Sequence, residues 1–304
     1  MSSVESLFKS LLNEHKDEET SYTLQLKVGL ATLYNYQGEY QKSLELLEPL
    51  DDSKDFFVLS ALGETYSGMN DFNNAKATFQ RLIDVFPRDT RSWVQYVNLL
   101  NKFNLQRDAV DSAARAELAI PNDPRLTVLS IRALIRSKAI EKAQQKMKAM
   151  EAKGNSSPMF TLFEGEIALF NKDYETASNL LTQYYNDYPS WDSAVPLANA
   201  LAMQDNAELG GKYLVQQTAK SHSKLRKIHY IAEYYAKNGE QDAAGEYYQA
   251  LLELIPEDFV TLNNYANLAI AQGNTGKAVE LAQKALKIQP NSPYAMDTLG
   301  WALF

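Results

Sequence analysis

The fold is decided by a stretch of sequence that occurs at least twice in similar form. Residues 62–87 read LGETYSGMNDFNNAKATFQRLIDVFP, and residues 265–290 read YANLAIAQGNTGKAVELAQKALKIQP. Both stretches place small residues, large apolar residues and a closing proline at the same offsets. These shared offsets indicate an internal repeat, which has to be examined before any single motif.

The closing residues give the length of the repeat. Pro87 and Pro121 are 34 residues apart, Asn155 follows after another 34, and Pro256 and Pro290 are again 34 apart. A period of 34 residues with small–large pairs and a closing proline resembles the tetratricopeptide repeat (TPR). The resemblance covers nearly the whole chain, with units that start near Leu24, Phe56, Thr90, Pro124, Pro158, Trp191, Leu225 and Phe259, and a ninth at Pro293.

The resemblance implies an all-α fold, a right-handed superhelical α-solenoid built from antiparallel helix pairs. Small residues such as Gly63 and Ala75 would let the two helices of a pair approach closely. Large residues such as Phe79 and Tyr248 would fill the space between neighbouring pairs. The glycines of Gln37-Gly38-Glu39, Asn238-Gly239-Glu240 and Gln272-Gly273-Asn274 are expected where a helix ends and φ turns positive.

Three segments complete the predicted organisation. Residues 1–20 resemble helix B of an incomplete repeat, because large apolar residues recur there at three- and four-residue spacing. Residues 21–292 hold about eight units, and residues 293–304 resemble helix A of a truncated ninth. Trp301 and Phe304 would leave an apolar face uncovered, whereas terminal repeats normally have a polar outer face. We therefore expect the chain to be a segment of a longer array.

The unit at residues 191–224 fits the repeat worst. Pro196 falls inside its expected helix A, and Gly210 and Gly211 fall inside its helix B. Residues 221–224 replace the usual junction that contains proline. Two interpretations stay open, namely drift of a tolerant repeat and a hinge between the repeats on either side.

Composition and motifs exclude several function classes. The chain of 304 residues has a net charge of −8, which argues against nucleic acid as the main partner. It has no cysteine and three histidines without HExxH spacing, so no metal site is predicted. We find no nucleophile–base constellation, and GNTGK at 273–277 lacks the first glycine and the strand of a phosphate loop. We expect no catalytic residues, no enzyme activity and no cofactor.

Proteins of this family usually hold a peptide or another protein on the concave surface that is lined by helix A. Register places the second, fifth, ninth, twelfth and thirteenth residues of each unit on that surface. The candidate partner-binding residues are Phe57, Arg91, Asn98, Lys102, Arg125, Arg132, Arg136, Arg226, His229, Lys237, Asn263 and Asn267.

An acidic protein thus carries a basic stripe near residues 91–136. Residues 121–153 hold eight Lys or Arg against three Asp or Glu. One interpretation is a groove for an acidic peptide or an anionic polymer, because arginine forms bidentate pairs with carboxylates. The other is a solvated charged face without a ligand.

Three functions follow from these observations. The first is a non-catalytic protein–protein interaction scaffold that binds a peptide or protein on the concave helix-A surface. The second is an envelope-associated factor in exopolysaccharide export or protein sorting that contacts an anionic polymer. The segment 297–303 and the many degenerate repeats resemble long bacterial envelope TPR proteins of the exopolysaccharide- and exosortase-associated type. The third is the TPR region of a larger enzyme.

The compartment follows only from the second of these functions. No signal peptide or membrane-spanning run occurs in the sequence. A fragment of an envelope protein would favour the bacterial periplasm or envelope over the cytoplasm.

Overall fold

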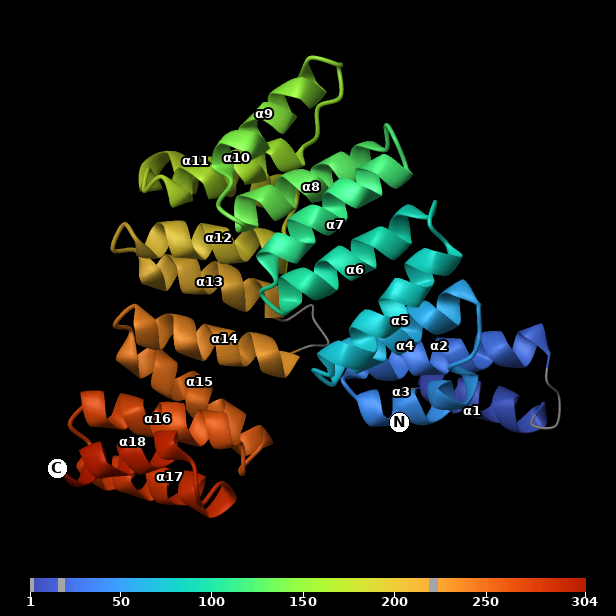
Figure 1. The fold of residues 1–304 in the computed structure, drawn as a ribbon. Helices are drawn as coiled ribbons and strands as arrows, with labels where there is room; N and C mark the ends of the chain where they lie inside the picture. The colour runs from blue at the N-terminus through green and yellow to red at the C-terminus, as the bar shows by residue number, and fades with distance from the viewer. Residues whose placement is uncertain (1–2, 16–19, 219–223) are drawn as a thin grey trace. The chain divides into compact units, whose positions relative to one another are not determined.

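The computed structural model describes residues 3–15, 20–218 and 224–304, and these residues form helices joined by short turns (Figure 1). Its contacts divide the chain into two compact units, residues 1–163 and 164–304. The fold is an all-α solenoid, as the repeat predicts.

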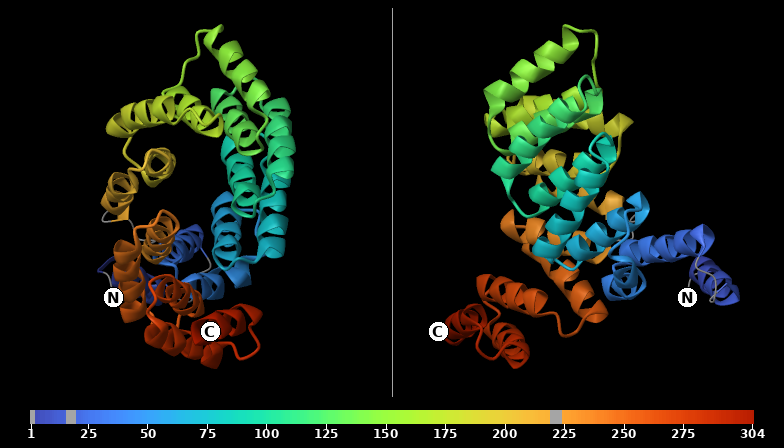
Figure 2. Two further views of the ribbon diagram at one scale, coloured as in Figure 1. Left: turned by 90° about the vertical axis from the view of Figure 1, so that its left-hand side faces the viewer. Right: turned by 45° about the vertical axis from the view of Figure 1, so that its right-hand side comes forward.

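Unit 1 consists of consecutive helices that pack against their neighbours in antiparallel pairs (Figure 2). Their bounds are α1 (Ser3–Glu14), α2 (Ser21–Gln37), α3 (Tyr40–Leu47) with the 3-10 turn η1 (Glu48–Leu50), α4 (Phe56–Gly68), α5 (Phe72–Val85), α6 (Thr90–Lys102), α7 (Gln106–Ala119), α8 (Pro124–Arg136) and α9 (Ile140–Glu151). The helix α10 (Met159–Phe170) contains the division between the units.

Unit 2 repeats the same arrangement. Its helices are α11 (Tyr174–Asp187), α12 (Trp191–Ala202), α13 (Ala207–Thr218), α14 (Lys224–Lys237), α15 (Gln241–Leu254), α16 (Phe259–Ala271), α17 (Thr275–Ile288) and α18 (Pro293–Leu303). The even-numbered helices from α4 to α18 are the first helices of successive pairs. Six of them begin at residues where the 34-residue register starts a unit, namely Phe56, Thr90, Pro124, Trp191, Phe259 and Pro293.

Aspartate side chains begin several of the first helices. Asp55, Asp89, Asp123 and Asp258 each have an extended backbone and accept a hydrogen bond from a backbone N–H in the first turn. Such a cap satisfies a donor that has no partner inside the helix and stabilises a helix by about 1 kcal/mol. These aspartates therefore fix where the first helices start, and hence which residues occupy the second position.

The turns inside the helix pairs have a left-handed residue, as predicted for the glycines. Gly38, Gly239 and Gly273 have φ values of 80°, 85° and 70°. Other pairs place a residue with a side chain in the same conformation, which the sequence did not predict. These residues are Asn70, Asn104, Lys138, Lys172 and Asp205, with φ between 56° and 64°.

The close approach predicted for small residues within a helix pair is confirmed, and Phe79 contacts Gly63 inside its own pair. Gly63 lies against the ring of Phe79, which leaves no room for a Cβ atom, and Gly165 lies in the same way against Leu181. Ala75 of α5 and Ala109 of α7, which lie in the second helices of their pairs, are fully buried. Each pair is thus held by a close helix–helix approach that larger residues would prevent.

The irregular unit has a packing explanation. Pro196 lies within α12 and is buried, so the helix continues through it. Gly210 and Gly211 are buried in α13, where the hydroxyl ends of Tyr234 and Tyr235 leave no space for a Cβ atom. These two glycines therefore allow close packing against α14, and the drift interpretation of the unit stays open. The hinge interpretation stays a prediction, since residues 219–223 of the junction lie outside the described residues.

Candidate functional site

Three of the predicted partner-binding residues meet in one hollow of unit 1. Asn98 from α6 and Arg125 and Arg132 from α8 line a space of about 600 Å³. The connection at residues 154–158, which leads from α9 to α10, forms its remaining wall. Repeat register alone placed these three residues on one surface, and the structure brings them to one site.

The wall of this hollow combines apolar and polar groups. Val94 of α6, Val128 and Leu129 of α8, Met150 of α9 and Met159 of α10 supply apolar surface. The guanidinium and amide groups supply a few hydrogen-bond donors among them. A concave apolar surface with few, fixed polar groups is typical of ligand-binding sites.

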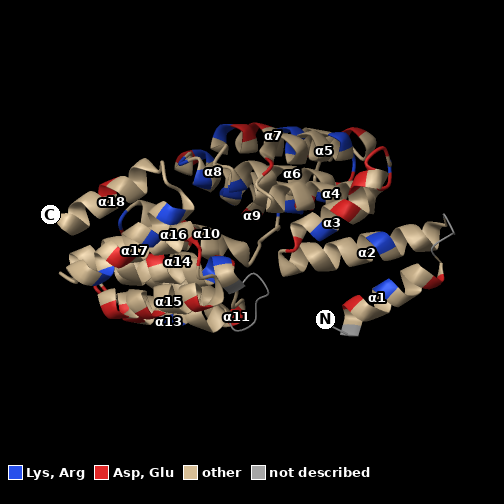
Figure 3. Cartoon of the chain, turned by 90° about the horizontal axis from the view of Figure 1, so that it is seen from below, with Lys and Arg blue, Asp and Glu red and all other residues tan. Residues whose placement is uncertain are grey.

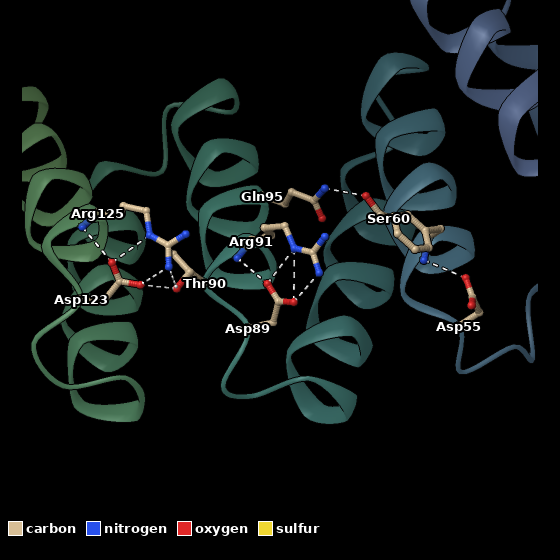
Figure 4. Close-up of polar contacts among 9 residues, drawn as sticks. Asp55, Ser60, Asp89, Thr90, Arg91, Gln95, Asp123 and Arg125 are labelled. Carbon is tan, nitrogen blue, oxygen red and sulfur yellow. Dashed lines mark hydrogen bonds and ion pairs between the residues drawn. The ribbon is translucent and has the colours of Figure 1, made fainter.

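Arg125 is held in place by the aspartate that begins its own helix. Its Nε donates to Asp123 Oδ1 at 3.0 Å and its Nη2 to Asp123 Oδ2 at 2.6 Å (Figure 4). Asp123 Oδ1 also accepts the backbone N–H of Arg125 at 2.9 Å, and Nη2 donates to Thr90 Oγ1 at 3.2 Å. The hydrogen bond from Arg125 lowers the pKa of Asp123 to about 2, against an opposing contribution from burial. Arg125 is thus a fixed and neutralised cation that also joins α8 to α6.

Arg91 of α6 repeats this arrangement in the preceding helix pair. Its Nε lies 3.0 Å from Asp89 Oδ1 and its Nη2 lies 2.6 Å from Asp89 Oδ2, so the pair is bidentate (Figure 4). The guanidinium carbon lies 4.0 Å from the ring centre of Phe56. The hydrogen bond from Arg91 lowers the pKa of Asp89. In the helix pair α4–α5, Asp55 caps α4 in the same way, but Phe57 takes the place of the arginine.

The rest of the predicted basic stripe divides into two kinds of side chain. Lys102 donates to the carbonyl oxygen of Ser67 and so connects α6 to α4. Arg132 is half-buried over the ring of Phe163, 5.7 Å from its centre. Within the described residues neither Arg132 nor the exposed Arg136 forms an ion pair. Figure 3 shows the arginines of α8 in blue.

Three of the predicted residues of unit 2, His229, Asn263 and Asn267, make contacts between neighbouring first helices. His229 Nε2 of α14 lies 3.5 Å from Asp258 Oδ2, at the start of α16. Asn263 Oδ1 and Asn267 Oδ1 of α16 accept hydrogen bonds from Thr298 Oγ1 of α18 at 3.0 and 3.4 Å. Arg226 and Lys237 are exposed on α14. None of these unit 2 residues lines the hollow of unit 1.

Sequence reasoning missed the apolar half of the site. Val94 and Val128 are fifth-position residues, so the register contained the signal for them. They are missing from the predicted residues because most of those are charged or polar. Asn155 and Met159 could not be assigned, because the 154–158 connection carries no helical period. Its placement against α8 depends on tertiary packing.

Neither a metal-ligand cluster nor a membrane-spanning helix occurs in the part of the chain that the structure describes. Across residues 3–15, 20–218 and 224–304, no three His, Asp or Glu side chains are grouped in a way that could hold a metal ion. In the same described ranges, no helix has both the length and the apolar character needed to cross a bilayer.

Comparison with protein families gives two matches, one in each unit. Residues 58–89 and residues 231–293 each match a family model described as tetratricopeptide repeat. No curated protein matches the sequence.

Solved structures with a similar fold are distant in sequence. A monomeric mutant of IFIT1 with m7Gppp-AAAA is 14% identical, with a TM-score of 0.57 over 98% of this chain and 75% of that one. The Cut9–Hcn1 complex gives 18% identity and a TM-score of 0.49 over 99% of this chain, which spans 52% of the matched chain. A tetratricopeptide repeat protein from Parabacteroides merdae gives 11% identity and a TM-score of 0.48, over 92% and 98% of the two chains.

The IFIT1 similarity establishes the fold alone, and the family follows from the two model matches. Both matches fall on helix pairs with the left-handed turns described above, and the match at 58–89 also contains the packing of Gly63 against Phe79. The chain therefore contains tetratricopeptide repeats, one matched segment in each unit.

Proposed function

We propose that unit 1 is a non-catalytic scaffold that holds a segment of a protein partner on its first-helix face. Tetratricopeptide repeats serve in general as scaffolds for protein–protein interaction. An apolar side chain of the partner enters the hollow, and an adjacent carboxylate binds Arg132. The observation that carries this proposal is the meeting of Asn98, Arg125 and Arg132 with apolar residues in one hollow.

Arg132 is the cation best suited to the partner's carboxylate. Arg125 already has two hydrogen bonds to Asp123, so its charge is compensated. Arg132 forms no ion pair within the described residues, and its position over the Phe163 ring limits the freedom that binding would remove. A planar guanidinium in this state can bind a carboxylate through two parallel hydrogen bonds.

The expected affinity is modest. Full burial of one leucine-sized side chain contributes about 1.5–3 kcal/mol, and a hydrogen bond to a charged group about 1.5–3 kcal/mol. Ordering the peptide costs part of this gain. A single hollow therefore supports binding at about the millimolar level, and a tighter complex needs further contacts along the face.

The test is selection from a displayed library of random peptides on the full chain and on two variants. Arg132→Glu reverses the charge inside the hollow. Arg136→Glu makes the same change one turn further along α8, outside the hollow, and serves as the control. We expect the wild type and Arg136→Glu to select peptides with Asp or Glu beside a bulky apolar residue. Arg132→Glu should lose this preference, and equal selection by all three proteins would contradict the proposal.

A second candidate is binding of an anionic polymer at the turn between α8 and α9. Arg136, Lys138 and Lys142 are exposed there, and no ion pair compensates them within the described residues. Binding of this kind is dominated by charge and weakens steeply as salt is added. Alginate provides a suitable probe. Its binding should fall strongly between 50 and 300 mM salt, on the scale set by the Debye length, and should be lost when the three residues are changed to glutamine.

A further inference from the structure

We infer that the partner segment is extended and has two apolar residues about five or six positions apart, one on Phe57 and one in the hollow. This inference rests on the proposed function, because it takes the hollow as one end of the binding site. It adds a second contact point and the conformation of the ligand between the two points.

Packing of the core does not explain why Phe57 is exposed. Its side chain is 59% exposed, whereas that of the preceding Phe56 is 8% exposed and belongs to the core. The two rings lie edge to face, 5.5 Å apart. Phe57 therefore lies at the margin of the core, on the surface where register places partner-binding residues.

Phe57 belongs to a row of equivalent positions in four successive helix pairs, which begin with α4, α6, α8 and α10. The backbone N–H of Phe57, Arg91, Arg125 and Met159 donates to a side-chain oxygen two residues earlier, at 2.8, 2.9, 2.9 and 3.3 Å. Phe57, Arg91 and Arg125 are thus the second residues of capped first helices, and Met159 is the first residue of α10. The shared hydrogen bond makes the four side chains start from equivalent points. Figure 4 shows Arg125, Arg91 and the Asp55 cap on adjacent helices.

The row has an apolar residue at each end, Phe57 and Met159, and two ion-paired arginines between them. Arg125 and Met159, at one end, line the hollow. Arg91 lies between Phe57 and the hollow, and its charge is compensated by Asp89. A ligand that crosses Arg91 therefore needs no carboxylate at that point. Its apolar residues contact the two ends, Phe57 and the hollow.

The distance between the ends sets the spacing in the ligand. Adjacent first helices touch, since Gln95 Nε2 lies 2.5 Å from Ser60 Oγ and Arg125 Nη2 lies 3.2 Å from Thr90 Oγ1. Packed helices have axes about 8–10 Å apart, so two steps from α4 to α8 span about 16–20 Å. An extended chain rises about 3.3 Å per residue and covers this distance in about five or six residues.

Spacing also distinguishes an extended ligand from a helical one. A helix rises about 1.5 Å per residue and would need about 11–13 residues to span the same distance. The dependence of affinity on spacing therefore reports the conformation of the bound ligand without a structure of the complex.

The experiment uses synthetic peptides with one leucine, a glycine–serine spacer of variable length and a terminal Leu-Asp pair. Fluorescence anisotropy with the full chain measures their affinities. We expect the tightest binding at a spacing of about five or six residues. Phe57→Ser should weaken this peptide about tenfold, to the affinity of a peptide that lacks the first leucine. Leu118→Ser is the control, because Leu118 is 81% exposed on α7, outside the row, and should have no effect.

Failure of the inference and failure of the proposed function give different results. Binding that Arg132→Glu and Val128→Asp weaken, but that depends neither on spacing nor on Phe57, overturns the inference and leaves the function standing. An optimum at about 11–13 residues overturns the extended conformation. Binding that the two hollow variants leave unchanged overturns both. Circular dichroism spectra of all variants show whether the helices are retained.

Discussion

At the scale of single residues, the helix pairs depend on a few positions where a side chain is either excluded or strained. Gly63 faces the ring of Phe79, which is buried. Lys172 has a φ of 64°, in the left-handed region that residues with a Cβ rarely adopt. Position 63 accepts only glycine, because a Cβ atom there would meet the Phe79 ring. Position 172 has a backbone conformation that favours glycine but holds a lysine.

Replacement of Gly63 with alanine should destabilise the protein, although alanine is the better helix former. The added Cβ would meet the Phe79 ring, and overpacking of this kind costs about 1–3 kcal/mol. Gly276→Ala is the matched control, since a Cβ in α17 at that point meets nothing within 4 Å. It should raise the free energy of unfolding by up to about 1 kcal/mol. Urea titration of both variants measures the two values, and effects of the same sign would contradict this account.

Replacement of Lys172 with glycine should stabilise the protein by about 1 kcal/mol. The left-handed conformation costs a residue with a Cβ about 1–2 kcal/mol, which glycine does not lose, although glycine gains freedom in the unfolded chain. Lys142→Gly makes the same exchange inside α9, where it should destabilise by about 1 kcal/mol. Thermal unfolding of the two variants should therefore show midpoint shifts of opposite sign.

At the scale of elements, the start of each first helix combines a cap with a connection to its neighbour. Asp123 caps α8, binds Arg125 and accepts a hydrogen bond from Thr90 of α6. Residues two apart on a helix do not face each other, so this pair forms only because Asp123 lies before the helix, with φ of −81° and ψ of 110°. The same backbone conformation at Asp89 gives the pair with Arg91.

Asp123 should make stability depend on pH in the acid range. Its pKa falls from an ordinary 3.8 to about 2 on folding, chiefly through the hydrogen bond from Arg125. A depressed carboxyl pKa adds stability above the unfolded value, and this stability is lost as pH falls from about 4 to 2. Since Arg125 is 71% exposed, we expect about 1–2 kcal/mol at neutral pH.

The variant Asp123→Asn tests this directly. It should unfold more easily than the wild type at pH 7, and the difference should shrink towards pH 2. Asp55→Asn is the control, because Asp55 caps α4 but Phe57 stands where the arginine would be. A difference for Asp123→Asn that stays constant from pH 7 to pH 2 would exclude the ionic contribution.

At the scale of the whole molecule, each helix pair is stabilised by its neighbours, because the contacts of a solenoid are local along the chain. The chain has two compact units, each with its own buried residues. Cooperativity is therefore expected to be strong within a unit and weaker across the chain.

Core substitutions should act on one unit at a time. Leu100 in unit 1 is fully buried, and Leu100→Ala should cost about 2–5 kcal/mol. Hydrogen exchange should accelerate in α4–α8 and change little in α14–α17. Leu281→Ala in α17 is the reciprocal variant and should give the reverse pattern. Equal acceleration in both units for either variant would show that the chain unfolds as one cooperative body.

The sequence predicted the fold well because the repeat is written in local terms. The helix starts at Phe56, Thr90 and Pro124 follow from the register, and the left-handed glycines follow from the ends of helices. The site was predicted in part. Register placed Asn98, Arg125 and Arg132 on one surface, but the charge of a residue does not reveal its partner.

The sequence by itself determined the helix pairs, their period and the surface that the first helices present, since these depend on residues a few positions apart. Only the tertiary structure decided that Arg125 is paired with Asp123, whereas Arg132 has no ion pair among the described residues, and that the 154–158 connection closes a hollow beside them. It also decided that Gly210 and Gly211 make room for Tyr234 and Tyr235. The physical reason is that such contacts join side chains about one repeat apart, whose distance depends on how the helices pack.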